Sequence, residues 1–251
     1  MRGLYSGALG MLAGMEKVHI VSNNLANAAT TGFKRLDGTY RSFSEHLMRH
    51  ERRALDGRVQ SAPVGRLGVG TQIDATYLHW SPGPLRETGS ELQAAIAGDA
   101  FFSVETPAGE AYTRDGRFVV DQDGWLVTLE GLRVLGTEGP LLAPGAQVCL
   151  SSAGELISDG EIVGFLRFVE FADPSALEPV GGGLYRPTQG SGAPTESEAQ
   201  LAVGFVEESN VNVVTEMVEL IAATRAYEAN QRVIVTYDDT LNKAVNELAR
   251  V

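Results

Sequence analysis

Few residues in this chain have types and spacings that could support chemistry. His46 and His50 are four residues apart, so on a helix they would share one face, as pairs of zinc ligands do. No third ligand with suitable spacing accompanies them, and Arg49, Arg52 and Arg53 would repel a cation. We therefore expect no metal site.

Two further motifs have simpler interpretations than a catalytic or cofactor site. DQDG at 121–124 contains part of a calcium-loop pattern, but apolar runs on both sides favour a hairpin turn. The glycines of RLGVG at 66–70 are in the wrong order for a dinucleotide loop. No phosphate loop, nucleophile elbow or zinc-protease helix occurs. We expect a protein that is not an enzyme and uses no cofactor.

Amide side chains are concentrated in SNNLANAATTGFK, residues 22–34. Asparagine is a poor helix former, yet Asn23, Asn24 and Asn27 fall where the pattern is otherwise helical. On a helix, Asn23 and Asn27 would project from one face, where amides can donate and accept hydrogen bonds across a contact. They either fix the register of an interface or lie exposed on a simple two-helix hairpin.

Composition places the chain among folded proteins with an uneven charge distribution. The 251 residues are 43% hydrophobic, carry a net charge of −12 and include one cysteine, Cys149, which excludes an internal disulfide framework. Residues 34–66 carry a net charge of +4, so the remainder carries −16. This basic band could contact an acidic surface or remain solvated. Charged residues interrupt the amino-terminal apolar pattern, so we expect neither a cleaved signal peptide nor a membrane span.

Both ends of the chain show a heptad pattern, which predicts long helices. In the first helix the apolar positions run from Leu4 to Leu25, and Gly32 is suited to cap its end. The second helix is expected over about 212–249, where no glycine or proline occurs. Its main series is Leu220, Tyr227, Ile234, Leu241 and Leu248, and its companion series is Met217, Thr224, Gln231, Asp238 and Val245.

The middle of the chain changes to a β pattern. Short apolar runs between residues 101 and 171 alternate with turn signals at 115–116, 123–124, 130–131 and 159–160. The sequence predicts an α+β fold in which long terminal helices pair as a coiled-coil-like module around a mostly antiparallel β domain. The expected domains are a helical module (1–32 and 210–251), a basic extended or β connecting segment (33–78) and a β-rich central domain (79–209).

With both ends in view, the sequence resembles the axial proteins of the bacterial flagellum, the basal-body rod and hook family. SNNLANAATTGFK looks like the amino-terminal signature of that family, and SNVNVVTEMVELIAATRAYEAN at 209–230 looks like its carboxyl-terminal counterpart. TRDGRF and GWLVTLEG resemble strands of its β domain. The resemblance covers nearly the whole chain and keeps the order of its parts.

The resemblance implies a structural subunit of the flagellar rod that polymerises into a helical tube and transmits torque. It implies partners among copies of itself and other rod and hook axial proteins, export by the flagellar type III apparatus and a place in the basal body. It implies neither nucleic-acid binding nor membrane insertion. The residues expected at subunit interfaces are Leu4, Met11, Met15, Val18, Asn23, Asn24, Leu25, Asn27, Phe33, Met217, Leu220, Tyr227, Asn230, Ile234, Leu241 and Leu248.

Within the family, the chain is too short for the extra outer domains of the hook protein. VLGTEGPLL at 134–142 is similar to the proximal-rod FlgF type, which we expect, with the distal-rod FlgG type as the alternative. Two alternatives come from other classes of protein. One is a secreted β binding module held on a coiled coil, which requires an exposed aromatic platform; Trp80 and Trp125 are the only tryptophans, and we expect Trp125 in WLVT to be in the core or half-buried. The other is an enzyme with an unrecognised site.

The basic band yields a prediction about assembly. Replacing Arg49, Arg52 and Arg53 with glutamate removes charges that would meet the acidic remainder of adjacent subunits. We expect weaker, more salt-sensitive assembly, measured by the yield of rods over a range of ionic strengths. Normal assembly at all salt concentrations would contradict the electrostatic role.

Overall fold

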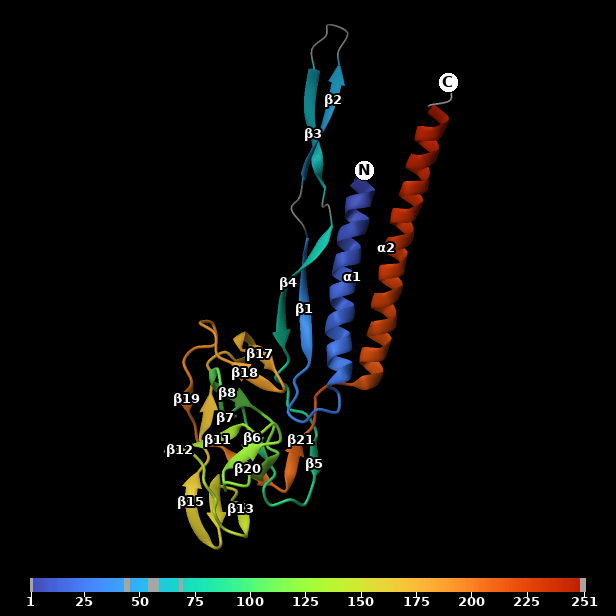
Figure 1. The fold of residues 1–251 in the computed structure, drawn as a ribbon. Coiled ribbons are helices and arrows are strands. Elements are labelled where there is room, and N and C mark those ends of the chain that lie inside the picture. The colour runs from blue at the N-terminus through green and yellow to red at the C-terminus, as the bar shows by residue number, and fades with distance from the viewer. Residues whose placement is uncertain (1, 43–45, 54–58, 68–69, 249–251) are drawn as a thin grey trace. The chain divides into compact units, whose positions relative to one another are not determined.

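The computed structural model describes residues 2–42, 46–53, 59–67 and 70–248 (Figure 1). The chain forms two compact units. The helical unit consists of Met1–Asn23, Leu36–Tyr77 and Val213–Val251, and the β unit consists of Asn24–Arg35 and Leu78–Asn212. The two terminal helices and the mostly antiparallel middle confirm the α+β fold class. Neither described helix is apolar enough over a sufficient length to cross a membrane.

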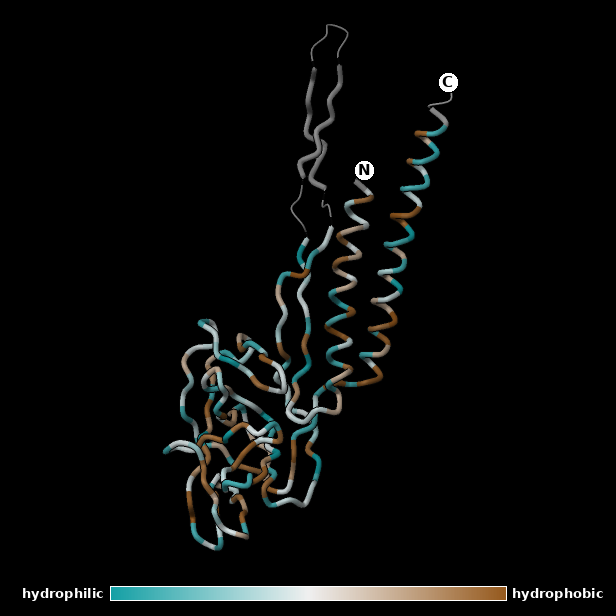
Figure 2. Tube along the Cα trace, viewed as in Figure 1, coloured by the Kyte–Doolittle hydropathy of each residue, from teal (hydrophilic) through white to brown (hydrophobic). Residues whose placement is uncertain are grey.

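The helical unit contains α1 (Arg2–Ala26) and α2 (Val213–Leu248), which run side by side in Figure 1. Both lie where the heptad patterns predict them. The absence of glycine and proline within α2 allows its 36 residues to continue without a break. Glu216 lies in the first turn of α2, where a carboxylate complements the positive end of the helix dipole. Figure 2 shows hydrophobic and hydrophilic residues interleaved along both helices.

The two helices approach each other along a row of glycines on α1. A methyl group at Gly7 would lie 3.1 Å from Cγ1 of Ile234, and one at Gly10 would lie 2.8 Å from Nδ2 of Asn230. Gly14 faces Tyr227 in the same way, with 3.6 Å to its Cβ. The row continues to Gly3, which faces the ring and hydroxyl of Tyr237. Small residues at heptad spacing therefore let the backbone of α1 come close to large side chains of α2.

The position of the helix contact on α2 corrects part of the sequence prediction. Tyr227 and Ile234 of the main series face α1, but the residues between and after them in the contact are Asn230 and Tyr237. The expected companion residues Thr224, Gln231, Asp238, Met217 and Val245 are all exposed. The predicted companion series lies one residue too far toward the carboxyl terminus of α2. The opposing face of α1 is glycine and does not require apolar partners, so the true contact residues leave no apolar heptad pattern in the sequence.

Two pairs of strands complete the helical unit: β1 (Leu36–Ser42) pairs with β4 (Thr71–Leu78), and β2 (His46–Arg53) pairs with β3 (Val59–Leu67). Ile20 of α1 lies against the first pair, since a methyl group at Gly38 would be 3.1 Å from its Cδ1. An ion pair of 3.2 Å joins Arg41 and Asp74 across the same strands.

His46 and His50 lie in strand β2 and not on a helix, so the helical face considered for them is wrong. Arg49, Arg52 and Arg53 also belong to β2, but their side chains lie outside the described residues, as does that of Leu248. Their predicted contacts remain predictions.

The main sheet of the β unit has ten strands: seven in the order β17-β18-β8-β7-β11-β10-β9, with β12 paired to β11, β16 to β7 and β19 to β16. Smaller sheets are β13-β14-β15, β20-β6 and β21-β5. A short 3-10 helix, η1, covers Pro174–Ala176. The strands are β5 (Leu85–Glu87), β6 (Ala94–Ala97), β7 (Phe101–Thr106), β8 (Gly109–Thr113), β9 (Phe118–Val120), β10 (Leu126–Thr128), β11 (Arg133–Gly136), β12 (Gly139–Pro140), β13 (Val148–Leu150), β14 (Glu155–Ser158), β15 (Glu161–Phe165), β16 (Phe168–Glu170), β17 (Glu178–Gly181), β18 (Leu184–Arg186), β19 (Thr195–Glu196), β20 (Gln200–Val203) and β21 (Phe205–Glu207).

Three of the four predicted turns join adjacent antiparallel strands. Residues 123–124 connect β9 to β10, which confirms a hairpin at DQDG, and Asp121 Oδ1 accepts the backbone N–H groups of Asp123 and Trp125. Asp159 and Gly160 both have positive φ, as a tight hairpin turn between β14 and β15 requires.

Asp115-Gly116 is different, and the hairpin expected there is wrong. The chain leaves β8 and crosses to β9, whose partner is β10. The carbonyl of Gly116 accepts the N–H of Ala94 at 3.0 Å, and a side chain at Gly116 would collide with the Ala94 carbonyl. Glycine is needed here for close backbone approach and not for a turn.

The core of the β unit is built from inward-facing strand residues. Phe102, Phe118, Leu126, Val134 and Leu156 are almost completely buried in one cluster. The rings of Phe102 and Phe118 meet edge to face with centroids 4.9 Å apart. This cluster gives the β unit a rigid interior on which the surrounding loops are fixed.

The glycine contact between the helices can be tested with Gly7→Leu. A leucine side chain at this buried position must displace Ile234, and we expect a loss of about 1–3 kcal/mol in the free energy of unfolding. Thermal unfolding followed by circular dichroism at 222 nm measures it. Ser6→Leu adds a similar side chain on the exposed side of the same helix and should change stability by less than about 0.5 kcal/mol. Equal stability of the two variants would exclude the contact.

Candidate functional site: a buried charged junction

Three segments that are distant in sequence meet in the β unit: 30–35, 78–84 and 205–211. Backbone hydrogen bonds tie them together. The Gly32 N–H donates to the Glu207 carbonyl at 2.8 Å, and the His79 N–H donates to the Arg35 carbonyl at 2.9 Å. Gly32 has φ +68°, and a methyl group there would lie 2.6 Å from the Asp115 nitrogen. Both the backbone conformation and the lack of space therefore require glycine at this position.

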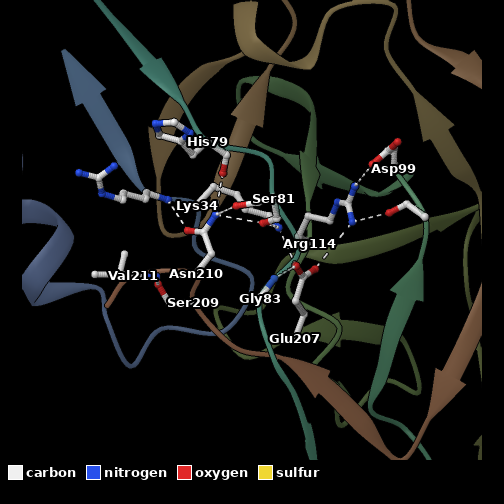
Figure 3. A network of polar contacts seen from close by, with 12 residues as sticks. Lys34, His79, Ser81, Gly83, Asp99, Arg114, Glu207, Ser209, Asn210 and Val211 are labelled. Carbon is white, nitrogen blue, oxygen red and sulfur yellow. Dashed lines mark hydrogen bonds and ion pairs between the residues drawn. The ribbon is translucent and has the colours of Figure 1, made fainter. Parts of the chain in front are cut away.

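The junction is built on an ion pair that is shielded from solvent. Lys34 Nζ lies 2.6 Å from Glu207 Oε1, and the two side chains are 1% and 3% exposed. The ammonium also donates to the Ser81 carbonyl at 3.1 Å, and the Gly83 N–H donates to Glu207 Oε1 at 2.9 Å. Figure 3 shows these groups converging on the Glu207 carboxylate. Each charge thus has the further hydrogen bonds that a buried ion pair needs.

Arg114 brings a second cation to the same carboxylate. Its Nη1 lies 3.7 Å from Glu207 Oε2 and donates to the Gly98 carbonyl at 2.8 Å, while Nη2 lies 4.0 Å from the exposed carboxylate of Asp99. The guanidinium also lies over the Phe101 ring, 4.9 Å from its centroid. Because Arg114 is 4% exposed, these contacts replace most of its hydration.

The buried cluster therefore holds two cations against one buried anion. Burial lowers the pKa of Lys34, and repulsion from Arg114 lowers it further, whereas Glu207 acts in the opposite direction. Burial also lowers the pKa of Arg114, with Glu207 again opposing the shift. The carboxylate of Glu207 is thus the group that allows both cations to remain charged in the interior.

Asn210 and a group of aromatic rings complete the junction. The Asn210 Oδ1 accepts the Arg35 N–H at 2.7 Å, and its Nδ2 donates to the His79 carbonyl at 2.7 Å. One amide thus satisfies backbone groups of two other segments. Trp80 meets Phe101 and Tyr185 edge to face, with centroids 5.0 and 4.9 Å away, and burial raises the pKa of Tyr185. The rings exclude water from the charged groups.

The three asparagines do not share one environment. Helix α1 ends at Ala26, so Asn27 lies beyond it and accepts a hydrogen bond from the Thr30 hydroxyl at 3.3 Å. The helical face expected for Asn23 and Asn27 is therefore wrong. Asn24 is completely buried, whereas Asn23 is exposed.

The other residues expected at subunit interfaces differ in exposure. Tyr227, Asn230 and Ile234 face the glycine row of α1. The most exposed members are Met15 at 41%, Met217 at 51% and Leu241 at 41%. The remaining described members are partly buried: Leu4, Met11, Val18, Leu25, Phe33 and Leu220. Their contacts with other subunits remain predictions.

Sequence reasoning missed the junction itself. It counted Lys34 in the basic band, but the structure buries this side chain almost completely. Arg114 and Glu207 lie within or beside segments used for the family resemblance, TRDGRF and SNVNV, yet nothing in their spacing indicates that they meet. The available signal was the presence of single charged residues next to apolar and glycine-rich segments. The junction positions backbone segments, and no group of three potential metal ligands occurs among the described residues.

Comparison with known sequences assigns the chain to a class of protein. Residues 4–34 match the family described as flagella basal body rod protein, and residues 202–247 match the flagellar basal body rod FlgEFG protein C-terminal region. Residues 95–161 match the flagellar hook protein FlgE/F/G D1 domain. These matches include Lys34, Arg114 and Glu207.

Individual relatives match nearly the whole chain. The chain is 34% identical to the flagellar basal-body rod protein FlgG of Buchnera aphidicola subsp. Acyrthosiphon pisum, over 96% of this chain and 97% of the relative. It is 31% identical to FlgG of Bacillus subtilis over 98% of each, and 33% identical to the rod protein FlgF of Caulobacter vibrioides over 99% and 98%. The chain belongs to the flagellar basal-body rod protein family.

The role of the buried ion pair can be tested by comparing the stability of variants at two adjacent glutamates, one buried and one exposed. Glu207→Gln leaves two buried cations without their carboxylate, and we expect a loss of about 3–5 kcal/mol in the free energy of unfolding. Glu208→Gln breaks an exposed pair with Arg86, 2.7 Å long, and should cost at most about 1 kcal/mol. Urea titration measures both values. Similar losses for the two variants would contradict a central role for Glu207.

Proposed function

We propose that this protein is a structural subunit of the bacterial flagellar basal-body rod. The observation that carries this conclusion is the match to rod proteins along nearly the full length of the chain, in both termini and the β region. The function is mechanical: a rod transmits torque through many simultaneous subunit contacts. The protein is not an enzyme, and it resides in the flagellar basal body.

The terminal helices form a coiled-coil-like pair whose outer faces contact other subunits. The glycine row on α1 and its large partners on α2 support this pairing. Apolar side chains remain exposed elsewhere on the helices, including Leu12 at 58%, Val218 at 62% and Ile221 at 62%. Exposed apolar groups of this density are typical of surfaces that become buried on association. Contacts between unlike surfaces that do not close on themselves generate a helical tube.

The partners are copies of this chain and other axial proteins of the rod and hook. The chain reaches them by export through the flagellar type III apparatus and assembles in the cell envelope. The resemblance of both terminal signatures to those of axial proteins supports this route.

The relatives do not separate the two rod types, because FlgG and FlgF proteins match at the same level of identity. We retain the proximal-rod FlgF type as the proposal, and the similarity of VLGTEGPLL to that type supports it. The distal-rod FlgG type is the alternative.

The coiled-coil-tethered binding module has less support. It requires an exposed aromatic platform, but neither tryptophan is exposed. Trp80 packs against Phe101 and Tyr185, and Trp125 is covered by the guanidinium of Arg133, 4.7 Å from its ring centroid.

Deletion of the chromosomal gene tests the function. We expect cells without flagella and purified basal bodies that end within the rod, as seen by electron microscopy. Truncation near the cell membrane identifies a proximal subunit, and truncation farther out identifies a distal one. Expression of the gene from a plasmid should restore full-length rods. Intact, rotating flagella in the deletion strain would contradict the proposal.

A further inference from the structure

The chain passes between the β unit and the helical unit through segments that lie next to one another in the β unit. Arg35 directly precedes β1, His79 directly follows β4, and Asn210 lies three residues before α2. A fourth passage lies within α1, after residue 23. Any load that passes along the chain from one unit to the other is carried by these four connections.

A connection made of one chain segment resists stretching but offers little resistance to twist. Its φ and ψ angles are soft, so the segment turns about its own bonds under a small torque. Three segments held at fixed distances from one another cannot turn independently, because rotation of one would break its bonds to the others. A stiff connection therefore requires a group that ties the segments together near the points where they leave the β unit.

The side-chain amide of Asn210 is such a group (Figure 3). Its Oδ1 accepts the Arg35 N–H at 2.7 Å. Its Nδ2 donates to the His79 carbonyl at 2.7 Å and to the Ser81 carbonyl at 3.0 Å. The His79 N–H also donates to the Arg35 carbonyl at 2.9 Å. One planar amide thus links all three segments close to the points where they leave the β unit.

The Asn210 amide is held in place by the rest of the junction. Its neighbours Ser209 and Val211 are 6% and 9% exposed, and the Ser209 hydroxyl accepts the Val211 N–H at 3.3 Å. The carbonyl of Ser81, which accepts from Asn210, also accepts from the Lys34 ammonium at 3.1 Å. The amide therefore rests on the buried ion pair, whereas the backbone groups that it holds lead out to the helical unit.

We propose that Asn210 is a positioning residue for torque transmission, because its amide locks three connecting segments into one torsionally stiff connection. Glu207 holds the interior of the β unit together, and Asn210 fixes the segments where they leave it. Asparagine suits this position because one side chain supplies an acceptor for Arg35 and a donor for His79 and Ser81. The inference rests on the proposed function, since it assigns a residue to the transmission of torque through the subunit.

Hydrogen exchange in the full-length protein tests the contact. Asn210→Ala removes the acceptor of the Arg35 N–H, and we expect this amide to exchange about tenfold faster, measured by mass spectrometry of peptides that contain residue 35. Asn210→Asp keeps an acceptor at the same place but removes the two donors, so exchange at Arg35 should stay slow. Glu208→Gln changes an exposed neighbour and should have no effect. Unchanged exchange at Arg35 in Asn210→Ala would overturn the proposal.

Rotation under load tests the mechanical role. Both Asn210 variants should assemble complete rods in a strain whose motor is paralysed. When the motor turns in a viscous medium, we expect a several-fold larger fraction of basal bodies with broken rods than in the unaltered strain, counted by electron microscopy. Val134→Ala lowers the stability of the β unit in its core, away from the three segments, and should show no dependence on load.

The outcomes separate this inference from the proposed function. If gene deletion truncates the rod but both Asn210 variants withstand load, the protein is a rod subunit and Asn210 does not stiffen it. If the rods of the variants are equally incomplete with and without rotation, Asn210 acts in assembly or stability and the proposal fails. If deletion leaves the rod intact, the proposed function fails as well.

Discussion

The carboxylate of Glu207 is the group that holds the β unit together at the point where the distant segments of the chain meet. It is buried with Lys34 on one side and Arg114 on the other, so neither cation can leave it without losing its only buried counter-charge among the described residues. The chain passes between its two units at four points, after residues 23, 35, 77 and 212. Segments next to three of these points are bonded to one another around this carboxylate. A buried ion pair adds little net stability compared with apolar packing. Here Glu207 contacts Lys34 of one distant segment and the Gly83 N–H of another.

The two units use different physical means to fix their parts. In the β unit the contacts are directional, since ion pairs and amide hydrogen bonds operate at short distance and in defined geometry. In the helical unit the contact is steric, because glycine leaves space that only large side chains such as Tyr227 and Ile234 fill. Neither kind of contact uses the exposed apolar residues of the helices, such as Leu12, Val218 and Ile221. These remain available for contacts outside the chain, as a subunit of a multi-protein assembly requires.

Much of this fold could be predicted from the sequence, because periodicity reports which face of an element is buried. The limits of α2, most strands and three of four turns follow from heptads, apolar runs and Asp-Gly pairs. The errors have physical causes. A glycine row has no apolar signal, so the contact face of α2 was placed one residue off. Lys34 was assigned to a charged surface because a charge count does not show burial. Its pairing with Glu207 spans 173 positions, and no local pattern encodes a contact of that range.

The strand pairings that close the β unit also govern when it can form. β5 pairs with β21, and β6 pairs with β20. Glu87 can therefore pair only after Phe205 has been synthesised, and Ala97 only after Gln200. A chain made from its amino terminus at about 5–20 residues per second needs about 6–24 seconds between the two strands of the first pair. During that interval β5 lacks β21, β6 lacks β20 and Lys34 lacks Glu207. The native unit therefore forms late in synthesis, and the growing chain stays open for factors that act on unfolded polypeptides.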